Sequence, residues 1–133
     1  MNFNNNRFEK QENGMSDHQR YCLALDLKDD EQLIEEYKSY HLPENGWPEI
    51  TQNMRDLGII DMEIYHLGDR LFMIMETSAD FDPNKPPLTE LGRQKSDEWE
   101  TLMWKYQKPL KWAKPGEKWV KMDKIYDLKL AKK

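Results

Sequence analysis

A tyrosine and a histidine at helical spacing are the residues of this sequence best suited to chemistry. Tyr37 and His41 lie four residues apart in EEYKSYHLPENGWPE (residues 35–49). In a helix, residues four apart share one face and lie one turn from each other. Histidine titrates near neutral pH, which suits proton transfer. The spacing therefore predicts an acid/base site at a helix end, although a histidine there often only stabilises the helix dipole.

Apolar periodicity predicts the elements that would position this pair, in the order strand, helix, strand, strand, helix, strand. A second helical piece follows the first helix. The predicted strands are 20–27, 60–67, 70–75 and 119–128, the helices are 30–41, 48–58 and 96–109, and residues 78–95 form a loop. Asp29 and Ser96 are the expected N-caps, Gly58 is the expected C-terminal cap, and Gly68-Asp69 is the expected hairpin turn.

This order predicts an α+β fold of the ferredoxin-like βαββαβ type, in which helices cover one face of an antiparallel sheet. The strands at 20–27 and 70–75 are apolar on both faces. The second face therefore needs a cover of its own, and the same sheet of a second copy is the simplest one. The pattern predicts a homodimer with a shared, barrel-like core.

Composition narrows the class of protein. The chain has 133 residues, which suits one domain at 20–133 after an N-terminal tail at 1–19 that we expect to be mobile. A net charge of −5 argues against nucleic-acid and anionic-membrane partners. A single cysteine, Cys22, offers no disulfide, and no apolar run marks a signal peptide or a membrane span, so we expect a cytoplasmic protein.

The remaining titratable residues give weaker signals. His18 lies in the predicted tail and His66 at a strand end, and the three histidines lack metal-ligand spacing. Glu35 and Glu36 are expected to be solvated, although either could orient His41. No Gly-rich phosphate loop is present. The sequence predicts neither a metal nor a cofactor.

Trp104 is unusual for its place on the last predicted helix. It lies roughly 150° around the helix from the apolar stripe of Trp99, Leu102, Met103 and Tyr106. A tryptophan off the core face needs another partner. Aromatic rings commonly cover the C–H faces of sugars, and a dimer contact is the alternative.

Six stretches of the chain resemble the L-rhamnose and L-fucose mutarotase family, in order and over most of residues 20–128. They are RYCLALDLKDD (20–30), EEYKSYH (35–41), WPEI (47–50), DMEIYHLGDRLFMIMET (61–77), EWETLMWKYQKPLKWAKPGEKWV (98–120) and KIYDL (124–128). The resemblance implies a dimeric α+β barrel that interconverts sugar anomers without a cofactor.

The resemblance also implies roles for individual residues. His41 matches the family's catalytic histidine, a proton donor, and Tyr37 matches a substrate-binding tyrosine four residues earlier. Where the family has two adjacent tryptophans that bind the sugar, this chain has Met103 and Trp104. Met62 stands in place of a tyrosine on the second strand. These five residues form the predicted site.

One further departure concerns the turn after the histidine. Five residues, 42–46, separate His41 from the Trp-Pro-Glu run, whereas the family usually has three. The turn must therefore bulge, and Trp47 is expected either to approach the site or only to anchor the second helical piece to the sheet.

The leading hypothesis is a mutarotase for a 6-deoxyhexose, L-rhamnose or L-fucose, with His41 as acid/base. The apolar side chains of Met62, Met103 and Trp104 suit a sugar that carries a methyl group in place of a hydroxymethyl. One alternative is a dimeric barrel that binds sugar without catalysis. Another is a cofactor-free monooxygenase of the same fold, which would need a larger apolar cavity for an aromatic or haem-like ligand.

Overall fold

Strand β1 (Gln19–Leu27) lies in the middle of an antiparallel sheet in the computed structural model, which describes residues 18–132. Along one edge it pairs with β3 (Arg70–Thr77), and β3 pairs in turn with β2 (Ile59–Leu67). Along its other edge it pairs with two short strands, β4 (Gln107–Lys108) and β5 (Val120–Lys121). The predicted α+β fold with this element order is confirmed.

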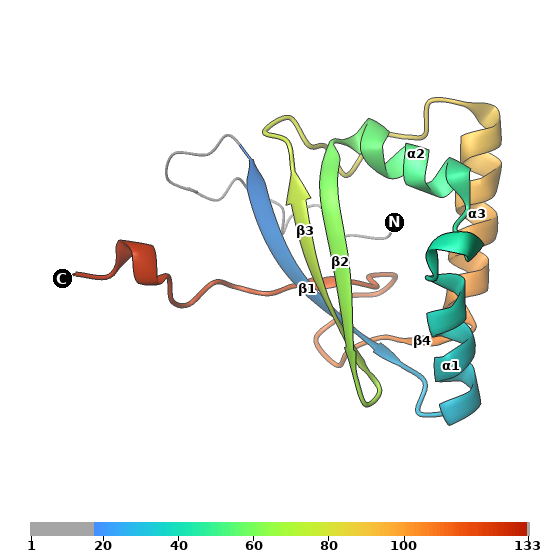
Figure 1. The fold of residues 1–133 in the computed structure, drawn as a ribbon, viewed down its shortest axis with the longest axis horizontal. Coiled ribbons are helices and arrows are strands. Elements are labelled where there is room, and N and C mark those ends of the chain that lie inside the picture. The colour runs from blue at the N-terminus through green and yellow to red at the C-terminus, as the bar shows by residue number, and fades with distance from the viewer. Residues whose placement is uncertain (1–17, 133) are drawn as a thin grey trace.

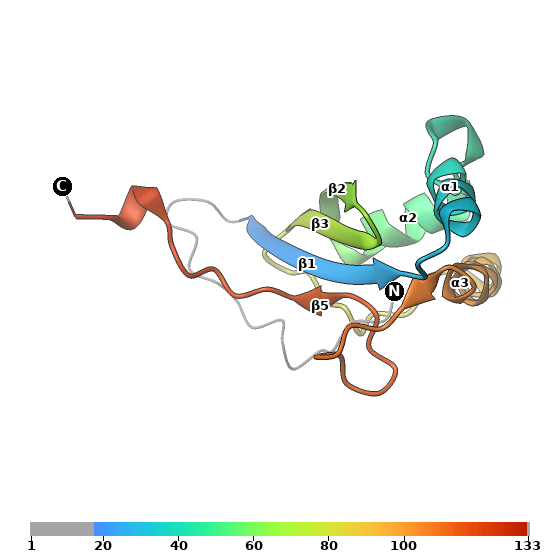
Figure 2. The same ribbon diagram turned by 90° about the horizontal axis from the view of Figure 1, so that it is seen from below.

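Three helices lie together on one side of this sheet (Figures 1 and 2). They are α1 (Glu31–Tyr40), α2 (Pro48–Leu57) and α3 (Glu90–Trp104). Asp30, and not the expected Asp29, caps α1, because its Oδ1 accepts the Leu33 N–H at 3.0 Å. Gly58 ends α2 as predicted, with a φ of 101° that favours glycine.

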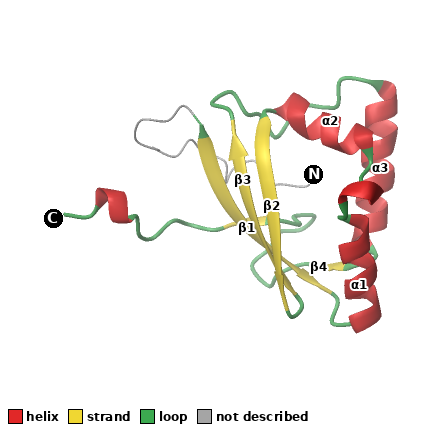
Figure 3. Ribbon diagram, viewed as in Figure 1, coloured by secondary structure: helices red, strands yellow, loops and turns green. Residues whose placement is uncertain are grey.

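The helices lie beside the sheet (Figure 3), and the core is formed by side chains of both. Alternate residues of β1 and β3 point toward the helices and are buried, as the period of two in these strands requires. They are Tyr21, Leu23, Leu25 and Leu27 on β1 and Leu71, Met73 and Met75 on β3. The predicted hairpin turn is also confirmed, since Leu67 pairs with Arg70 around Gly68-Asp69.

Helix α3 begins earlier and ends earlier than the sequence predicts. Thr89, not Ser96, is its N-cap, and its Oγ1 accepts the Gly92 N–H at 2.9 Å. Gly92 permits a close approach of α2, whose Asn53 amide donates to the Gly92 carbonyl at 2.9 Å. Because this first part of α3 is polar apart from one leucine, no apolar stripe marked it.

The last predicted strand, 119–128, is wrong in length. Only Val120 and Lys121 form β5, opposite Ala24 and Leu23 of β1. The chain then leaves the sheet and extends away from it, ending in a short 3₁₀ turn at Leu128–Leu130 (Figures 1 and 2). Five large apolar side chains of the segment after β5 are exposed, and Ile125 is 95% exposed.

The face of the sheet opposite the helices is apolar and only partly buried. It carries Cys22 and Ala24 of β1 and Phe72 and Ile74 of β3. A cavity of about 720 Å³ lies there, with a mainly apolar lining that includes Phe72, Leu110, Trp112, Val120 and Met122. The described part of the chain therefore leaves this face open.

Most of the predicted N-terminal tail lies outside the residues that the structure describes. Residues 1–17 of the predicted tail lie outside the described residues, whereas Gln19 already belongs to β1. His18 lies 3.3 Å from a carboxylate oxygen of Glu76.

No helix within residues 18–132 has the length and apolar character needed to cross a bilayer.

The cap at Gly58 gives a stability prediction. A Cβ at this position would lie 2.6 Å from the Ser78 Oγ and 3.3 Å from the Phe81 Cα, in a left-handed conformation. Gly58→Ala should therefore lower the free energy of unfolding by about 2 kcal/mol in urea denaturation. Gly46→Ala is the control, since Gly46 has a φ of −64° and a Cβ there would lie 3.6 Å from its nearest neighbour. Equal changes in the free energy of unfolding for the two substitutions would contradict the C-terminal cap at Gly58.

Candidate active site

A small cavity lies between the helices and the sheet, where the predicted Tyr37–His41 pair sits. Its volume is about 110 Å³. Side chains from α1, α2, α3, β2, β3, β4 and the segment before β5 surround it. They are Tyr37, His41, Ile50, Met54, Met62, Ile64, Met73, Trp99, Glu100, Met103, Gln107, Lys118 and Trp119.

The end of α1 fixes the imidazole of His41. The backbone N–H of His41 bonds to the Lys38 carbonyl at 3.1 Å. The Nδ1 of His41 forms a hydrogen bond with the Tyr37 carbonyl, one turn back, at 2.8 Å. A carbonyl oxygen only accepts hydrogen bonds, so in the neutral imidazole Nδ1 carries the proton. Nε2 is then the unprotonated nitrogen, which can accept a proton.

Aromatic rings hold the imidazole from two sides. The ring of Tyr37 stacks on it with centroids 4.4 Å apart, as the spacing of four residues predicts. Trp99 of α3 meets it edge-on at 5.7 Å. His41 as a whole residue is exposed although it lines the cavity, which places it at the cavity opening.

These surroundings change the proton affinities of both residues. Burial of the imidazole lowers the pKa of His41 below its ordinary value of 6.5, and the hydrogen bond to the Tyr37 carbonyl opposes this in part. Burial raises the pKa of Tyr37 to about 12, with a hydrogen bond to the Gln107 side chain opposing the rise and the charge of Glu100 adding to it. At neutral pH the imidazole is therefore neutral and the phenol keeps its proton.

The longer turn after His41 is accommodated by a short 3₁₀ helix, Pro43–Asn45. The Asn45 side-chain amide donates to the Ser39 carbonyl at 2.7 Å, so the insertion also satisfies the end of α1. Trp47 then packs edge-on against Trp99 with ring centroids 5.1 Å apart. Trp47 does not line the cavity itself, and it supports the tryptophan that does.

Three polar side chains line the cavity besides Tyr37 and His41. Lys118 and Glu100 form an ion pair of 2.6 Å, and only 3% of the Lys118 side chain is exposed. The Lys118 ammonium also donates to the Glu100 carbonyl at 3.2 Å. Gln107 of β4 is buried as well. A bound ligand would thus meet hydrogen-bonding groups as well as the apolar side chains of methionine, isoleucine and tryptophan.

The structure brings four of the five predicted site residues together. Tyr37, His41, Met62 and Met103 line the cavity. Trp104 is not among the lining residues, and the Lys118 ammonium lies over its ring at 4.5 Å from the centroid. The sugar-binding role of Trp104 stays a prediction, and the contact that this structure gives it is with Lys118.

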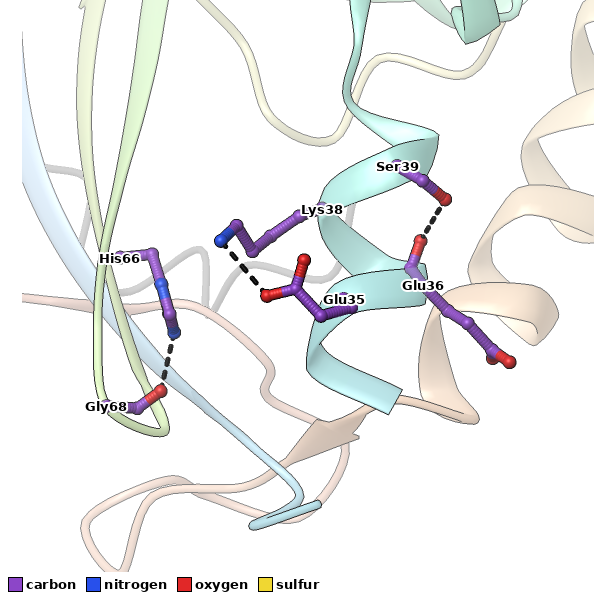
Figure 4. A network of polar contacts seen from close by, with 6 residues as sticks. All are labelled: Glu35, Glu36, Lys38, Ser39, His66 and Gly68. Atoms are coloured by element: carbon purple, nitrogen blue, oxygen red, sulfur yellow. Dashed lines mark hydrogen bonds and ion pairs between the residues drawn. The ribbon is translucent and has the colours of Figure 1, made fainter. Parts of the chain in front are cut away.

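Other titratable residues near α1 make local contacts instead (Figure 4). His66 bonds to the Gly68 carbonyl in its own hairpin. Glu35 pairs with Lys38 at 3.3 Å on the exposed side of α1, and Glu36 lies 3.9 Å from the Lys105 ammonium. Neither glutamate orients His41, whose Nδ1 bonds to backbone. Among residues 18–132 no three His, Cys, Asp or Glu side chains converge as a metal site.

Sequence reasoning missed nine residues of the lining, and five of these lie on α3, on β4 and in the segment before β5. Trp99 and Glu100 precede Met103 by four and three residues on α3. Helical spacing could therefore have predicted that they share its face. Trp119, Gln107 and Lys118 come from short strands and the loop between them. Their positions depend on how this segment packs against the helices, and no local pattern marks them.

The fold and this cavity define a small α+β protein in which a histidine lies at the opening of a small cavity. The model of the L-rhamnose mutarotase family matches residues 20–128, so the chain belongs to that family.

Individual relatives agree with this assignment. The chain is 41% identical over 110 residues to an L-fucose mutarotase of Xanthomonas campestris pv. campestris, covering 83% of this chain and 88% of that protein. It is 44% identical over 117 residues to a UPF0734 protein of Dictyostelium discoideum, covering 84% and 91%. The crystal structure of an L-rhamnose mutarotase of Formosa agariphila has the same fold, with a TM-score of 0.56, 17% identity and coverage of 83% and 98%.

The environment of His41 predicts its titration. In a proton NMR titration, the imidazole signal that disappears in His41→Ala should have a midpoint below 6.5, because burial disfavours the imidazolium. Trp99→Leu removes one of the rings beside the imidazole and should move the midpoint back toward 6.5. A midpoint at or above 6.5 in the unmodified protein would contradict the environment described here.

Proposed function

We propose that this protein is a mutarotase that interconverts the α and β anomers of a 6-deoxyhexose, L-rhamnose or L-fucose. The observation that supports this best is a neutral imidazole held at the opening of a small cavity with its Nε2 unprotonated. Family membership supplies the reaction class, since mutarotases are isomerases. The geometry suggests how the proton transfers proceed.

His41 carries both proton transfers in this mechanism. Nε2 accepts the proton of the anomeric hydroxyl, O1, while the C1–O5 bond breaks and a C1=O1 carbonyl forms. The imidazolium then delivers a proton to O5. Because O1 and O5 are both bonded to C1, one imidazole can serve them in turn. After rotation about the C1–C2 bond the steps reverse, and no net proton is gained or lost.

Tyr37 positions the sugar in this proposal. Its hydroxyl stays protonated at neutral pH, since its pKa is raised to about 12. A protonated phenol can donate a hydrogen bond to a sugar oxygen without becoming a competing base. The same residue supplies the carbonyl that holds His41, so substrate contact and imidazole orientation share one helical turn.

The dimensions of the cavity favour a monosaccharide over the larger ligand of a monooxygenase. Its volume of about 110 Å³ is well below the roughly 300–1,000 Å³ of sites for drug-sized ligands. The polar side chains of Glu100, Gln107 and Lys118 also suit a hydroxylated ligand. The apolar side chains of Met62 and Met103 suit the methyl group of a 6-deoxyhexose.

Magnetisation exchange between the anomeric proton signals of L-rhamnose, and of L-fucose, tests the function. The protein should accelerate exchange for at least one of them, and His41→Ala should lower the catalysed rate by on the order of 10²–10⁴. His66→Ala is the matched control, because His66 bonds only within its hairpin turn and should leave the rate unchanged.

Two results would contradict the proposal. Binding of either sugar, seen as thermal stabilisation, without any exchange would favour the non-catalytic sugar-binding barrel. Full exchange in His41→Ala would remove His41 from the mechanism while leaving the reaction class in place.

We also propose that the protein is a homodimer formed through the open face of the sheet. This face is apolar at Ala24, Phe72 and Ile74 and carries the cavity of about 720 Å³. The C-terminal segment beyond β5 extends from the molecule with apolar side chains exposed, Ile125, Tyr126, Leu128 and Leu130. A second copy would cover both regions with complementary apolar surface.

Sedimentation velocity tests the dimer. The unmodified protein should sediment as a dimer, and Ile74→Lys should sediment as a monomer, because a charge at the centre of an apolar interface is costly to bury. Leu88→Lys is the control, since Leu88 is exposed in the loop before α3 and should leave the dimer intact. A monomeric unmodified protein, or a dimer that persists in Ile74→Lys, would contradict the interface.

We propose the cytoplasm as its compartment. The single cysteine and the acidic, highly charged composition support this.

A further inference from the structure

Gln107 presents a buried hydrogen-bonding atom that the protein itself does not satisfy. The residue is 4% exposed and lines the cavity. Its Oε1 has no hydrogen-bond partner among the described residues. Its side chain also hydrogen-bonds to the Tyr37 hydroxyl and lowers the pKa of that phenol, so Gln107 donates this bond. The donor end of the amide is therefore used while the acceptor end is open.

An open acceptor of this kind is costly to the folded protein. A buried polar atom without a partner loses its hydration and gains nothing in return. Such atoms are rare in folded proteins. Other polar groups reach the same cavity, since Glu100 and Lys118 also line it as an ion pair. Polar groups from α3, β4 and the segment before β5 thus converge on one small space.

We propose that Gln107 is a substrate-binding residue whose Oε1 accepts a hydrogen bond from a hydroxyl of the bound sugar. A pyranose hydroxyl supplies the donor that the protein leaves out. The Gln107–Tyr37 hydrogen bond then links this hydroxyl to the residue that holds His41, so recognition and orientation of the sugar act together. This inference rests on the proposed function, and it assigns to Gln107 the recognition of a sugar hydroxyl.

Calorimetric binding with a series of sugars tests the assignment. Gln107→Met keeps the length of the side chain but removes its amide. It should weaken binding of L-rhamnose or L-fucose about 3- to 10-fold, which corresponds to the loss of one neutral hydrogen bond. Gln94→Met, on an exposed part of α3, should bind as the unmodified protein does. Gln107→Glu keeps an acceptor oxygen at the same place and should retain the preference for the hydroxyl.

Sugars that lack one hydroxyl identify the partner of Oε1. Among the 2-, 3- and 4-deoxy analogues, one should bind equally to the unmodified protein and to Gln107→Met, because the hydrogen bond is then absent from both. In a Tyr37→Phe background, Gln107→Met should still weaken binding of the complete sugar. This separates a direct contact from an effect transmitted only through Tyr37.

Several outcomes would overturn the assignment. Unchanged affinity in Gln107→Met would do so, as would the same loss for every analogue, or no further loss in the Tyr37→Phe background. Anomer exchange is measured in the same samples. If the unmodified protein catalyses exchange and any of these results is found, only the role of Gln107 is contradicted. If the sugar binds but no exchange is catalysed, the proposed function is contradicted. The binding affinities of the variants then decide separately whether Gln107 contacts the sugar.

Discussion

The hydrogen bond between Nδ1 of His41 and the carbonyl of Tyr37 is the interaction on which the site depends. The last carbonyls of any helix lack intrahelical partners, and α1 uses one of them to fix an imidazole. One contact thereby sets the tautomer, orients the ring and satisfies the helix end. This carbonyl belongs to the residue one turn before His41, and the same spacing of four residues brings the Tyr37 ring against the imidazole with centroids 4.4 Å apart.

The rest of the structure partly buries that imidazole, which favours its neutral form. Trp99 packs against it from α3, and Trp47 supports Trp99 from the turn that the insertion after His41 has lengthened. The sheet supplies the apolar floor through Met62 and Met73. Burial lowers the pKa of His41, so that at neutral pH the imidazole is in its basic form, the form that can accept a proton. Helices α1 and α3, the sheet and the turn after His41 thus together position this imidazole.

Much of this arrangement could be predicted from local sequence patterns. The alternation of β1 and β3, the hairpin at Gly68-Asp69, and the Tyr37–His41 pair all follow from periods of two and of about 3.6 residues. The start of α3 could not be predicted, because polar residues fill its first turns. Gln107 and Lys118 were missed for a different reason. A polar residue in a short strand or a loop reaches the cavity only through packing between distant segments, and periodicity does not report such packing.

The protonation state of His41 tests the central claim most directly. Long-range ¹⁵N–¹H NMR correlation on ¹⁵N-labelled protein near neutral pH distinguishes the two neutral tautomers, and comparison with His41→Ala assigns the signals. We expect Nδ1 to show the shift of a protonated nitrogen and Nε2 that of an unprotonated one. A protonated Nε2, in the opposite tautomer or in an imidazolium, would contradict the account, since the cavity would then meet a nitrogen that cannot accept a proton.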